Sequence, residues 1–514
     1  MQQTRTNKSL QVVLISLFIA LFFLSRVPLL SRDESNPDGV NWHYRSQQFI
    51  IGLKTLHFEK TYQHYHPGVT LMWISGVPVE IFKHLSGITT YDMFNFEAFH
   101  LVAKFSLIVA QLFLSLFITF LLSKFIGPEK ATLVVALVSF EPFFLGNSRL
   151  YHMDVLLALF MFASLLLAYL ALVRKSLAYS IIAGVVISLS FLTKSIGVSA
   201  LFYIVFFFAM YFSQKKDWKG FLKYTGILLM AFVAASFLFF PALFRGPMYY
   251  VGEIFGEAQR IGIRRGHSQI IFGESTMDAG PLFYPLVIFL KVSPFTLIGT
   301  LTFCLLSFKL KRSRFGGLSF FLLIFYLGYF VFMCLPTKKI DRYMIPVFPY
   351  LAYVAILGYF KLYELIKPVV KAVFYLATLA ILILLFIAYP AVKLFPYLFT
   401  YTSPLFGTPK HANSLVAQKP FGIGIFELKD KILQKYGNYP RLGFLDVKPM
   451  QSIYPNSKIF DIRVYSPGNY DLLILGINEE MPDKVEDNRT KFVKDYSLYI
   501  NGLEYWRVYV KENK

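Results

Sequence analysis

The feature that most constrains this chain is a series of apolar runs, each long enough to cross the hydrocarbon of a lipid bilayer. A helix needs about 20 mostly apolar residues to span that layer. The runs predict about eleven transmembrane helices. Their expected positions are 10–30, 101–123, 131–147, 153–173, 177–193, 196–213, 223–244, 282–307, 317–336, 343–360 and 371–391. The first run lacks a small-residue cleavage site and is too long for a signal peptide, so we expect a membrane anchor.

The composition agrees with an integral membrane protein. Of the 514 residues, 56% are hydrophobic and 16% are charged, against about 25% charged in soluble domains. The formal charge of +21 would suggest a nucleic-acid partner in a soluble protein. In a polytopic membrane protein it has a simpler origin, because cytoplasmic loops collect Lys and Arg. We therefore expect no nucleic acid among the partners.

The basic loops predict the orientation. With the N-terminus in the cytoplasm, every loop expected inside contains Lys or Arg, in agreement with the positive-inside rule. These loops are 124–130, 174–175, 215–223, 309–314 and 361–371. An odd number of spans then puts the C-terminal segment outside a bacterial or archaeal cell membrane.

Residues 1–395 are expected to form the membrane domain, with its site built by the outer loops 31–100 and 245–281. Residues 396–514 are predicted to form a small extracytoplasmic α/β domain. Within it, Phe421 to Tyr436 has helical spacing, DLLILG at 471–476 is typical of a buried strand, and Asn501-Gly502 predicts a hairpin.

Several cations lie on the predicted outer side of the membrane, where the positive-inside rule does not predict an excess of Lys and Arg. The stretch LPTKKIDRYMIP places Lys338, Lys339 and Arg342 at the outer face. The other outer cations are Lys194, Lys291 and the cluster Arg260, Arg264 and Arg265. Cations at membrane depth are costly and usually face a cavity or a partner. Two interpretations follow: some bind an anionic ligand, or they reach outward to the phosphates of membrane lipids.

Two acids of the outer face are candidates for catalysis. Asp38 lies in NPDG after the first span, and Asp154 lies at the outer start of the fourth. They have structural interpretations as well: Asp38 as a turn residue and Asp154 as a favourable charge at a helix N-terminus. A carboxylate can act as general base on a hydroxyl, while Lys and Arg hold a phosphate and stabilise it as it leaves. Together they suit attack by an acceptor hydroxyl on a sugar whose leaving group is a lipid-linked phosphate, through an oxocarbenium-like transition state.

The chain resembles the GT-C glycosyltransferases of the group that includes protein O-mannosyltransferases and the lipid A aminoarabinose transferase. The likeness covers about 10–390 and rests on the order of individually weak motifs. These are Asp38-Gly39 with Trp42 and Phe49, then His66-Pro67-Gly68, then Arg149 to Asp154, then Phe283 to Pro294, and finally Lys338, Arg342, Tyr343, Pro346 and Pro349.

The resemblance implies that Asp38 is the base and that Asp154 supports the site. It implies a substrate-binding set of Arg149, Lys194, Arg265, Lys338, Arg342, Tyr343 and His66, of which Lys338 and Arg342, with Arg265 or Lys194, contact the donor phosphate. Two departures leave alternatives open. Many relatives have Asp-Glu where this chain has Asp38-Gly39, so Asp33, in the nearby Asp33-Glu34 pair, is a rival base. His66 replaces a Lys or Glu-Lys of relatives; with His64 it can hold a divalent metal ion or form polar loop surface.

The sequence thus predicts an all-α polytopic glycosyltransferase. It would move a sugar from a polyprenyl-phosphate carrier to a protein, lipid or glycan acceptor outside the membrane, with inversion. An O-antigen-type polymerase or ligase is an alternative, because such enzymes place arginines in outer loops. A lipid-linked-sugar flippase or transporter is another, although no pseudo-repeat of the expected kind is visible.

Overall fold

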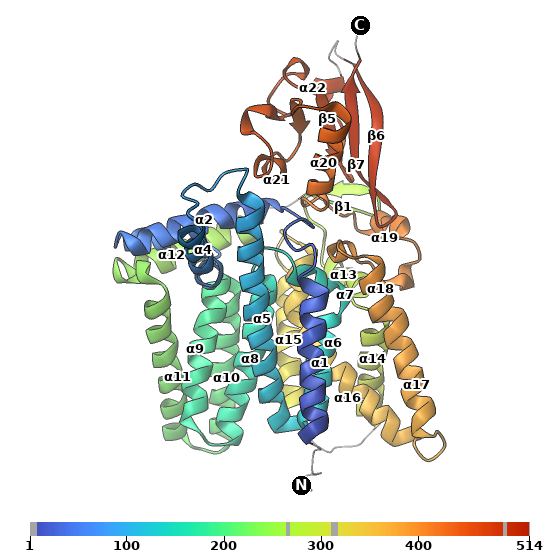
Figure 1. Ribbon diagram of the computed structural model, residues 1–514. Coiled ribbons are helices and arrows are strands. Elements are labelled where there is room, and N and C mark those ends of the chain that lie inside the picture. Colours follow the sequence, from blue (N-terminus) through green and yellow to red (C-terminus); the bar gives the residue numbers. More distant parts are fainter. Residues whose placement is uncertain (1–7, 264–267, 310–316, 487–490, 513–514) are drawn as a thin grey trace.

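The computed structural model describes residues 8–263, 268–309, 317–486 and 491–512. Its helices form an upright bundle, and a small β-sheet lies over one end of the bundle, here called the sheet end (Figure 1). The predicted polytopic helical fold with a small C-terminal α/β part is confirmed.

In the described part of the chain, six helices are long and apolar enough to cross a membrane, or up to eight spans if each of two bent helix pairs counts as one. Three shorter apolar helices accompany them. Every predicted segment has a helix or a bent pair at its position. The bundle helices are α1 (Lys8–Arg26), α5 (Phe96–Ile126), α6 (Pro128–Phe140), α7 (Pro142–Ser148), α8 (Asp154–Val173), α9 (Leu177–Thr193), α10 (Ser199–Gln214), α11 (Trp218–Phe239), α13 (Phe283–Lys291), α14 (Pro294–Lys309), α15 (Leu318–Cys334), α16 (Phe348–Ile366), α17 (Ala372–Ile383) and α18 (Tyr389–Lys393).

The two bent pairs are α6 with α7, at 71°, and α13 with α14, at 115°. A proline opens the second helix of each pair, and proline cannot donate the backbone hydrogen bond that a continuous helix needs. The carboxylate of Glu141, at the first break, accepts hydrogen bonds from Ser293 Oγ (2.9 Å) and Thr296 Oγ1 (2.7 Å) at the second. The two breaks are therefore fixed to each other.

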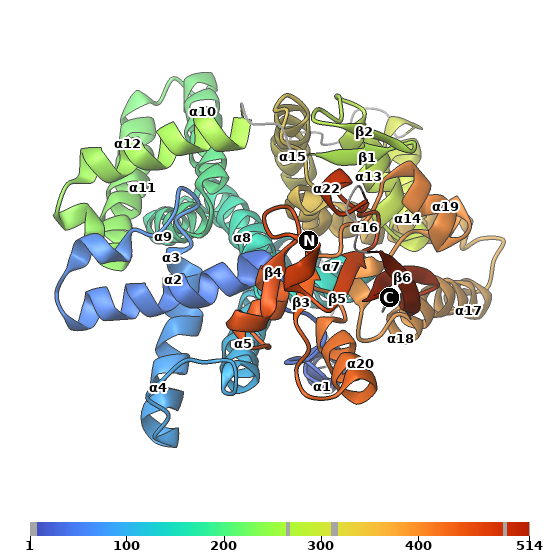
Figure 2. The same ribbon diagram turned by 90° about the horizontal axis from the view of Figure 1, so that it is seen from above.

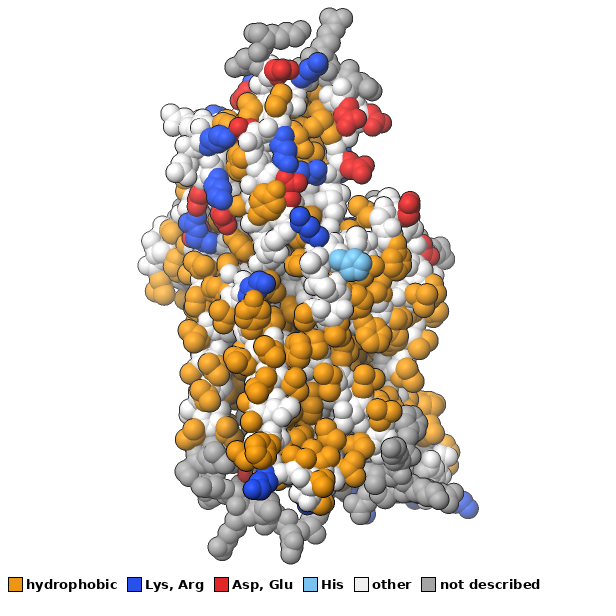
Figure 3. All heavy atoms as spheres, turned by 90° about the vertical axis from the view of Figure 1, so that its right-hand side faces the viewer, with side chains coloured by type: hydrophobic (Ala, Val, Ile, Leu, Met, Phe, Trp, Pro, Cys, Tyr) orange, Lys and Arg blue, Asp and Glu red, His pale blue; other side chains and the backbone are white. Residues whose placement is uncertain are grey.

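The placement of charge fits a bilayer around the bundle. One face of the molecule shows a broad apolar belt over the helices, with charged side chains gathered above it on the C-terminal part (Figure 3). The turns joining α8 to α9, α10 to α11 and α16 to α17 lie at the end away from the sheet (Figure 1). Those turns hold three of the predicted basic loops. Residues 310–314 of another basic loop lie outside the described residues, as do Arg264 and Arg265.

Three helices lie across the bundle at its sheet end (Figures 1 and 2): α2 (Pro37–Lys54), α4 (Val77–Ser86) and α12 (Pro247–Glu257). Helix α4 continues a short helical stretch that begins with α3 (Val69–Leu71). Helix α2 begins with a strong signal: the Asn36 side chain accepts a hydrogen bond from Gly39 N, and Pro37 occupies the first helical position. Asp38 thereby falls in the first turn.

The C-terminal sheet has the order β4-β3-β5-β7-β6. Its strands are β3 (Leu442–Phe444), β4 (Ile459–Asp461), β5 (Leu472–Gly476), β6 (Phe492–Ile500) and β7 (Leu503–Lys511), with helices α20 (Ile425–Tyr436), α21 (Lys448–Gln451) and α22 (Asp483–Glu486) beside it. Strands β4, β3 and β5 are parallel, and β6–β7 form the predicted hairpin, with positive φ at Asn501 and Gly502. The predicted buried strand and helix are also present.

The sheet packs directly on the bundle. Phe96 of α5 and Leu150, just after α7, belong to the same buried apolar cluster as β3, β5 and α20. A two-stranded hairpin, β1 (Gln269–Ile271) and β2 (Glu274–Thr276), and helix α19 (Pro409–Leu415) complete the sheet end. The division of the chain at 395/396 stays a prediction.

Candidate functional site

A cavity of about 510 Å³ lies between the sheet end of the bundle and the C-terminal sheet. This volume is in the usual range for small-ligand sites. Among the described residues, six cations line it: Arg45, Lys194, Lys291, Lys338, Arg342 and Lys419. Because they come from membrane helices, outer loops and the C-terminal part, folding brings together charges that are scattered in the sequence.

Arg342 lies at the centre of the charge network. Its Nη2 donates to Asp38 Oδ2 at 2.5 Å, and its Nε lies 3.2 Å from Asp154 Oδ2. The other oxygen of Asp154 accepts a hydrogen bond from Lys194 Nζ at 2.7 Å. His152 completes the group, with its two ring nitrogens 3.0 Å from Asp154 Oδ2 and 3.6 Å from Asp38 Oδ2. One guanidinium thus bridges both predicted catalytic acids.

The two acids occupy different depths. The side chain of Asp38 is 41% exposed and lines the cavity, whereas that of Asp154 is 4% exposed and lies beneath the lining residues. Burial by itself would raise the pKa of Asp38, but the charge of Arg342 and the hydrogen bond from His152 outweigh it, so the pKa stays well below its usual value. Asp38 is therefore ionised and accessible, and Asp154 holds the surrounding cations in place.

The remaining predicted residues that the structure describes lie around this group. Lys194 Nζ is 4.1 Å from the centre of the Tyr343 ring, and both residues line the cavity with Lys338. His66 also lines it, and its Nδ1 is 3.3 Å from Ser195 Oγ. Of the LPTKKIDRYMIP cations, Lys339 differs: its Nζ donates to Asp278 Oδ1 at 3.1 Å and to the carbonyl of Pro336. Arg265 lies outside the described residues.

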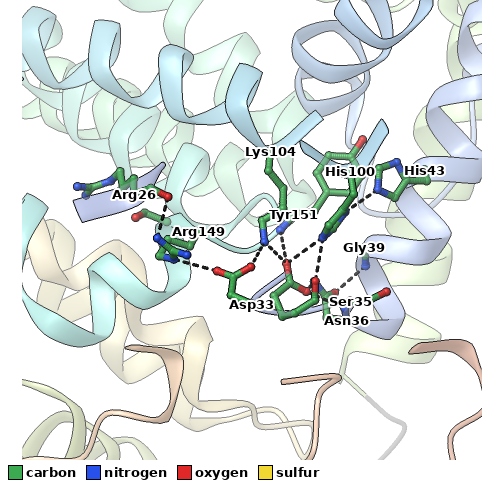
Figure 4. Close-up of polar contacts among 12 residues, drawn as sticks. Arg26, Asp33, Ser35, Asn36, Gly39, His43, His100, Lys104, Arg149 and Tyr151 are labelled. Carbon is green, nitrogen blue, oxygen red and sulfur yellow. Dashed lines mark hydrogen bonds and ion pairs between the residues drawn. The ribbon is translucent and has the colours of Figure 1, made fainter. Parts of the chain in front are cut away.

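Arg149 and Asp33 belong to a cluster of polar contacts that also includes Lys104 (Figure 4). Arg149 Nε donates to Asp33 Oδ2 at 2.9 Å, and its terminal nitrogens donate to the carbonyls of Arg26 and Pro28. Lys104 Nζ donates to the other Asp33 oxygen at 2.6 Å. Neither Arg149 nor Asp33 is among the described residues that line the cavity. Asp33 and Arg149 therefore contact each other inside the protein, and the substrate-binding role of Arg149 and the rival-base role of Asp33 stay predictions.

The neighbouring Glu34 connects this buried cluster to the site. Glu34 Oε2 accepts from both the backbone N and the side-chain nitrogen of Asn36, at 2.7 Å each, and Oε1 accepts from Tyr151 N at 3.2 Å. Lys104 and His100 contact the same side chain. Asn36 caps the helix that carries Asp38, and Tyr151 immediately precedes His152. Glu34 therefore fixes two backbones that bear site residues.

Sequence reasoning did not select several residues of this cavity. Arg45 lies two helical turns after Asp38 on α2, a spacing that puts both on one face, and its guanidinium lies 4.6 Å from the Trp42 ring centre. Lys419, Asp446 and Glu479 come from the C-terminal part. Asp446 and Glu479 each follow a strand of the parallel part of the sheet, a position where ligand-binding residues often lie. That signal was present in the sequence.

The two histidines considered for metal binding lie side by side, with ring centres 5.6 Å apart. Burial, then the nearby charge of Arg45, lowers the pKa of His64 to about 3, and burial with the charge of Lys194 lowers that of His66 well below its usual value. Both rings are therefore neutral, the form that binds metals. Within the described residues, however, no group of three or more His, Cys, Asp or Glu side chains is arranged to hold a metal ion.

The fold is that of a polytopic membrane protein with a charged cavity at its sheet end. Residues 92–240 match the family model of the dolichyl-phosphate-mannose-protein mannosyltransferases. This segment runs from the start of α5 to the end of α11 and includes Asp154 and Lys194. No curated protein sequence matches the chain at a significant level.

Solved structures share the fold over nearly the whole chain. The ArnT structure from Cupriavidus metallidurans bound to undecaprenyl phosphate has a TM-score of 0.52 at 14% identity, covering 98% of each chain. The oligosaccharyltransferase of Archaeoglobus fulgidus tethered to an acceptor peptide has a TM-score of 0.51 at 14% identity, covering 92% of this chain and 70% of the other. The predicted resemblance to the GT-C group is thereby confirmed. At these low sequence identities, the likeness to the solved structures shows the fold alone.

Proposed function

We propose that this chain is an integral membrane glycosyltransferase that moves a sugar from a polyprenyl-phosphate carrier to an acceptor hydroxyl, with inversion. One observation carries the proposal: the ionised carboxylate of Asp38 is hydrogen-bonded to Arg342 at the edge of a cavity that Lys194 and Lys338 also line. A general base and a phosphate site thus meet in one place. The bound undecaprenyl phosphate of the ArnT structure supports a lipid phosphate as donor.

The cations hold the donor phosphate in this proposal. Arg342 binds phosphate oxygens in its planar, two-pronged geometry, and Lys338 and Lys194 add positive charge. The Arg342 guanidinium is paired with Asp38 and Asp154. A donor phosphate competes for the same nitrogens. Binding of the donor therefore loosens the Asp38–Arg342 pair and raises the pKa of Asp38, which makes that carboxylate a stronger base at the moment it is needed.

The transfer step exchanges one bond at the anomeric carbon for another. The acceptor oxygen forms a bond to the anomeric carbon on the face opposite the phosphate, while its proton passes to Asp38. The bond between the anomeric carbon and the phosphate oxygen breaks, and its electron pair leaves with the polyprenyl phosphate. Arg342 and Lys338 stabilise the negative charge that grows on this oxygen. Attack from the opposite face inverts the anomeric configuration.

The orientation is part of the proposal. With the N-terminus in the cytoplasm, the sheet end and its cavity face the outside of the cell membrane, and the basic turns face the cytoplasm. The lipid chain of the donor would lie against the apolar helices, with its phosphate at the membrane surface. The acceptor is a protein, lipid or glycan that reaches the cavity from outside.

The polymerase or ligase alternative has less support. It rests on arginines in outer loops, and Arg260 is exposed, pairs with Glu257 three residues away and is not among the described residues lining the cavity. The flippase alternative requires charges near the middle of the membrane in two matching halves, whereas the described charge network around Arg342 lies at the sheet end.

Turnover of a lipid-linked sugar tests the proposal. Undecaprenyl-phosphate sugars with a radiolabelled hexose or pentose are supplied to the purified protein with cell-envelope extract as acceptor, and release of label from the lipid phase is measured. We expect release by the wild-type protein and a loss of about 100-fold or more in Asp38→Asn. Equal release by Asp38→Asn and wild type would refute Asp38 as base. Absence of release from every donor would refute the transferase.

A further inference from the structure

The segment 419–424 of the C-terminal part lies against the chain that leads into α2. Ser35 N donates to the carbonyl of Gly422 at 3.2 Å, and Gly424 N donates to the carbonyl of Asp33 at 3.1 Å. Gly422 has a φ of +66°, and a Cβ at this position would collide with the carbonyl oxygen of Ser35. Only glycine fits so close a crossing of two backbones. The C-terminal segment and the start of α2 are therefore fixed to each other.

Phe421, next to this crossing, has an unusual backbone conformation. Its φ is +47°, in the left-handed region. That region is unfavourable for a bulky side chain, and residues held in it are concentrated at functional sites. The ring of Phe421 lines the cavity, and its centre lies 4.6 Å from Cζ of Arg342. The strained residue of the C-terminal part thus contacts the central cation of the proposed donor site.

Two further rings support the ring of Phe421. It stacks on Phe399, with ring centres 5.3 Å apart and an angle of 22° between the planes. Phe399 stacks in turn on Phe143 of α7, with ring centres 6.0 Å apart and an angle of 29°. Phe143 is fully buried in the core of the bundle. The aromatic surface that Arg342 contacts is therefore anchored in the membrane helices as well as in the C-terminal part.

The contact with Phe421 differs in kind from the contacts of Arg342 with its two acids. Asp38 and Asp154 contact nitrogens of the guanidinium, and these are the atoms that a phosphate needs. An aromatic ring attracts a guanidinium through its face and takes up none of its N–H donors. The contact with Phe421 can therefore persist when a phosphate replaces the carboxylates, and it then takes over the support of the guanidinium.

We propose that Phe421 is a positioning residue for donor binding: its ring holds the Arg342 guanidinium in place while the lipid phosphate replaces Asp38 and Asp154 as its partner. This rests on the proposed function. The C-terminal part then does more than cover the cavity, because it supplies a component of the donor site.

The affinity of the full-length protein in lipid nanodiscs for undecaprenyl phosphate tests the proposal. Phe421→Leu removes the aromatic face and keeps an apolar side chain, whereas Phe421→Tyr keeps the face. We expect affinity about tenfold weaker than wild type in Phe421→Leu and within twofold of wild type in Phe421→Tyr. Arg342→Lys keeps the charge without the flat guanidinium, so in that background Phe421→Leu should weaken binding by less than threefold.

The matched control is Phe460→Leu. Phe460 is a half-buried ring of the C-terminal part that packs edge-on against Tyr465, and it is not among the described residues that line the cavity. This variant should bind undecaprenyl phosphate as wild type does. The unfolding temperature without lipid is recorded for every variant and should be similar in Phe421→Leu and Phe460→Leu.

Three results would overturn the positioning role of Phe421 and leave the proposed function standing. They are wild-type affinity in Phe421→Leu, equal losses in Phe421→Leu and Phe421→Tyr, and an undiminished effect of Phe421→Leu in the Arg342→Lys background. A lower unfolding temperature together with weak binding in both Phe421 variants would show a merely structural role and would overturn it too. Failure of the wild type to bind undecaprenyl phosphate would overturn the proposed function, and this inference with it.

Discussion

Asp38 and Arg342 are 304 residues apart in the sequence and form a hydrogen-bonded ion pair at 2.5 Å at the edge of the cavity. The pair joins the first cross helix, α2, to the short helix that precedes α16. Arg342 also contacts Asp154, so the predicted base, its supporting acid and the predicted phosphate ligand form one unit. In the proposed mechanism, the donor phosphate rearranges this unit.

Substitution of Asp33 and substitution of Asp38, the two candidate bases, should have different effects on stability and on turnover. Asp33→Asn removes the buried negative charge that Lys104 and Arg149 both contact, and breaking a buried ion pair costs about 3–5 kcal/mol. The temperature of thermal unfolding should therefore be lower for Asp33→Asn than for wild type. Asp38→Asn changes a partly exposed side chain, so it should unfold near the wild-type temperature but turn over no substrate. Normal stability with lost turnover in Asp33→Asn would identify Asp33 as the base.

Arg342→Ala should weaken donor binding far more than acceptor binding. Loss of a two-pronged contact between guanidinium and phosphate typically costs about 2–3 kcal/mol, or roughly 30- to 150-fold in affinity. Arg342→Lys should recover part of it. The control Arg260→Ala removes an exposed arginine outside the cavity and should change nothing. Equal losses for donor and acceptor would mean that LPTKKIDRYMIP is structural.

Glu34→Gln tests whether the buried cluster positions Asp38. The substitution keeps the shape but removes the charge that Lys104 faces and puts an N–H₂ group where Glu34 accepts from Asn36 or Tyr151. Turnover should fall by about tenfold, undecaprenyl phosphate affinity should stay within twofold, and residues 36–45 should exchange amide hydrogens faster.

The control for this experiment is Glu97→Gln, which disturbs a half-exposed pair with Arg32. It should leave both turnover and exchange unchanged. If Glu34→Gln exchanged at the wild-type rate and kept full turnover, the cluster would have no positioning role.

We expect the affinity for the donor to depend on pH through the charge of Lys419. Burial lowers the pKa of Lys419 to about 8, so its charge is present below pH 8 and is lost as the pH rises through this value. Affinity for undecaprenyl phosphate should therefore fall by about fivefold between pH 7 and pH 9, equivalent to ~1 kcal/mol for one charge several ångströms away. Lys419→Arg should shift this fall to higher pH. Unchanged affinity across the range would place the phosphate away from Lys419.

The membrane helices, the C-terminal hairpin and part of the candidate site could be predicted from the sequence. Apolar runs of bilayer length locate the membrane helices, because a helix in lipid must satisfy its own backbone. The Asn501-Gly502 hairpin follows from local turn chemistry. The order of the motifs around Asp38, Asp154 and Arg342 brought those residues into one proposed site.

The rest depends on contacts between distant segments. No local pattern indicates that Arg149 would turn away from the cavity to Asp33, or that Glu34 would bond to Tyr151. The position of Asp446 and Glu479 just after strands could mark them as candidates for ligand binding, but only the docking of the sheet on the bundle makes them part of this cavity.

The most direct test of the account is a titration of the purified protein in nanodiscs with undecaprenyl phosphate and with undecaprenol, the same lipid without phosphate. Thermal stabilisation is followed for wild type, Lys338→Ala/Arg342→Ala and Arg260→Ala. We predict stabilisation of wild type and Arg260→Ala by the phosphate alone, and its loss in the double variant. Equal stabilisation by both lipids, or full stabilisation of the double variant, would contradict a phosphate site at Arg342.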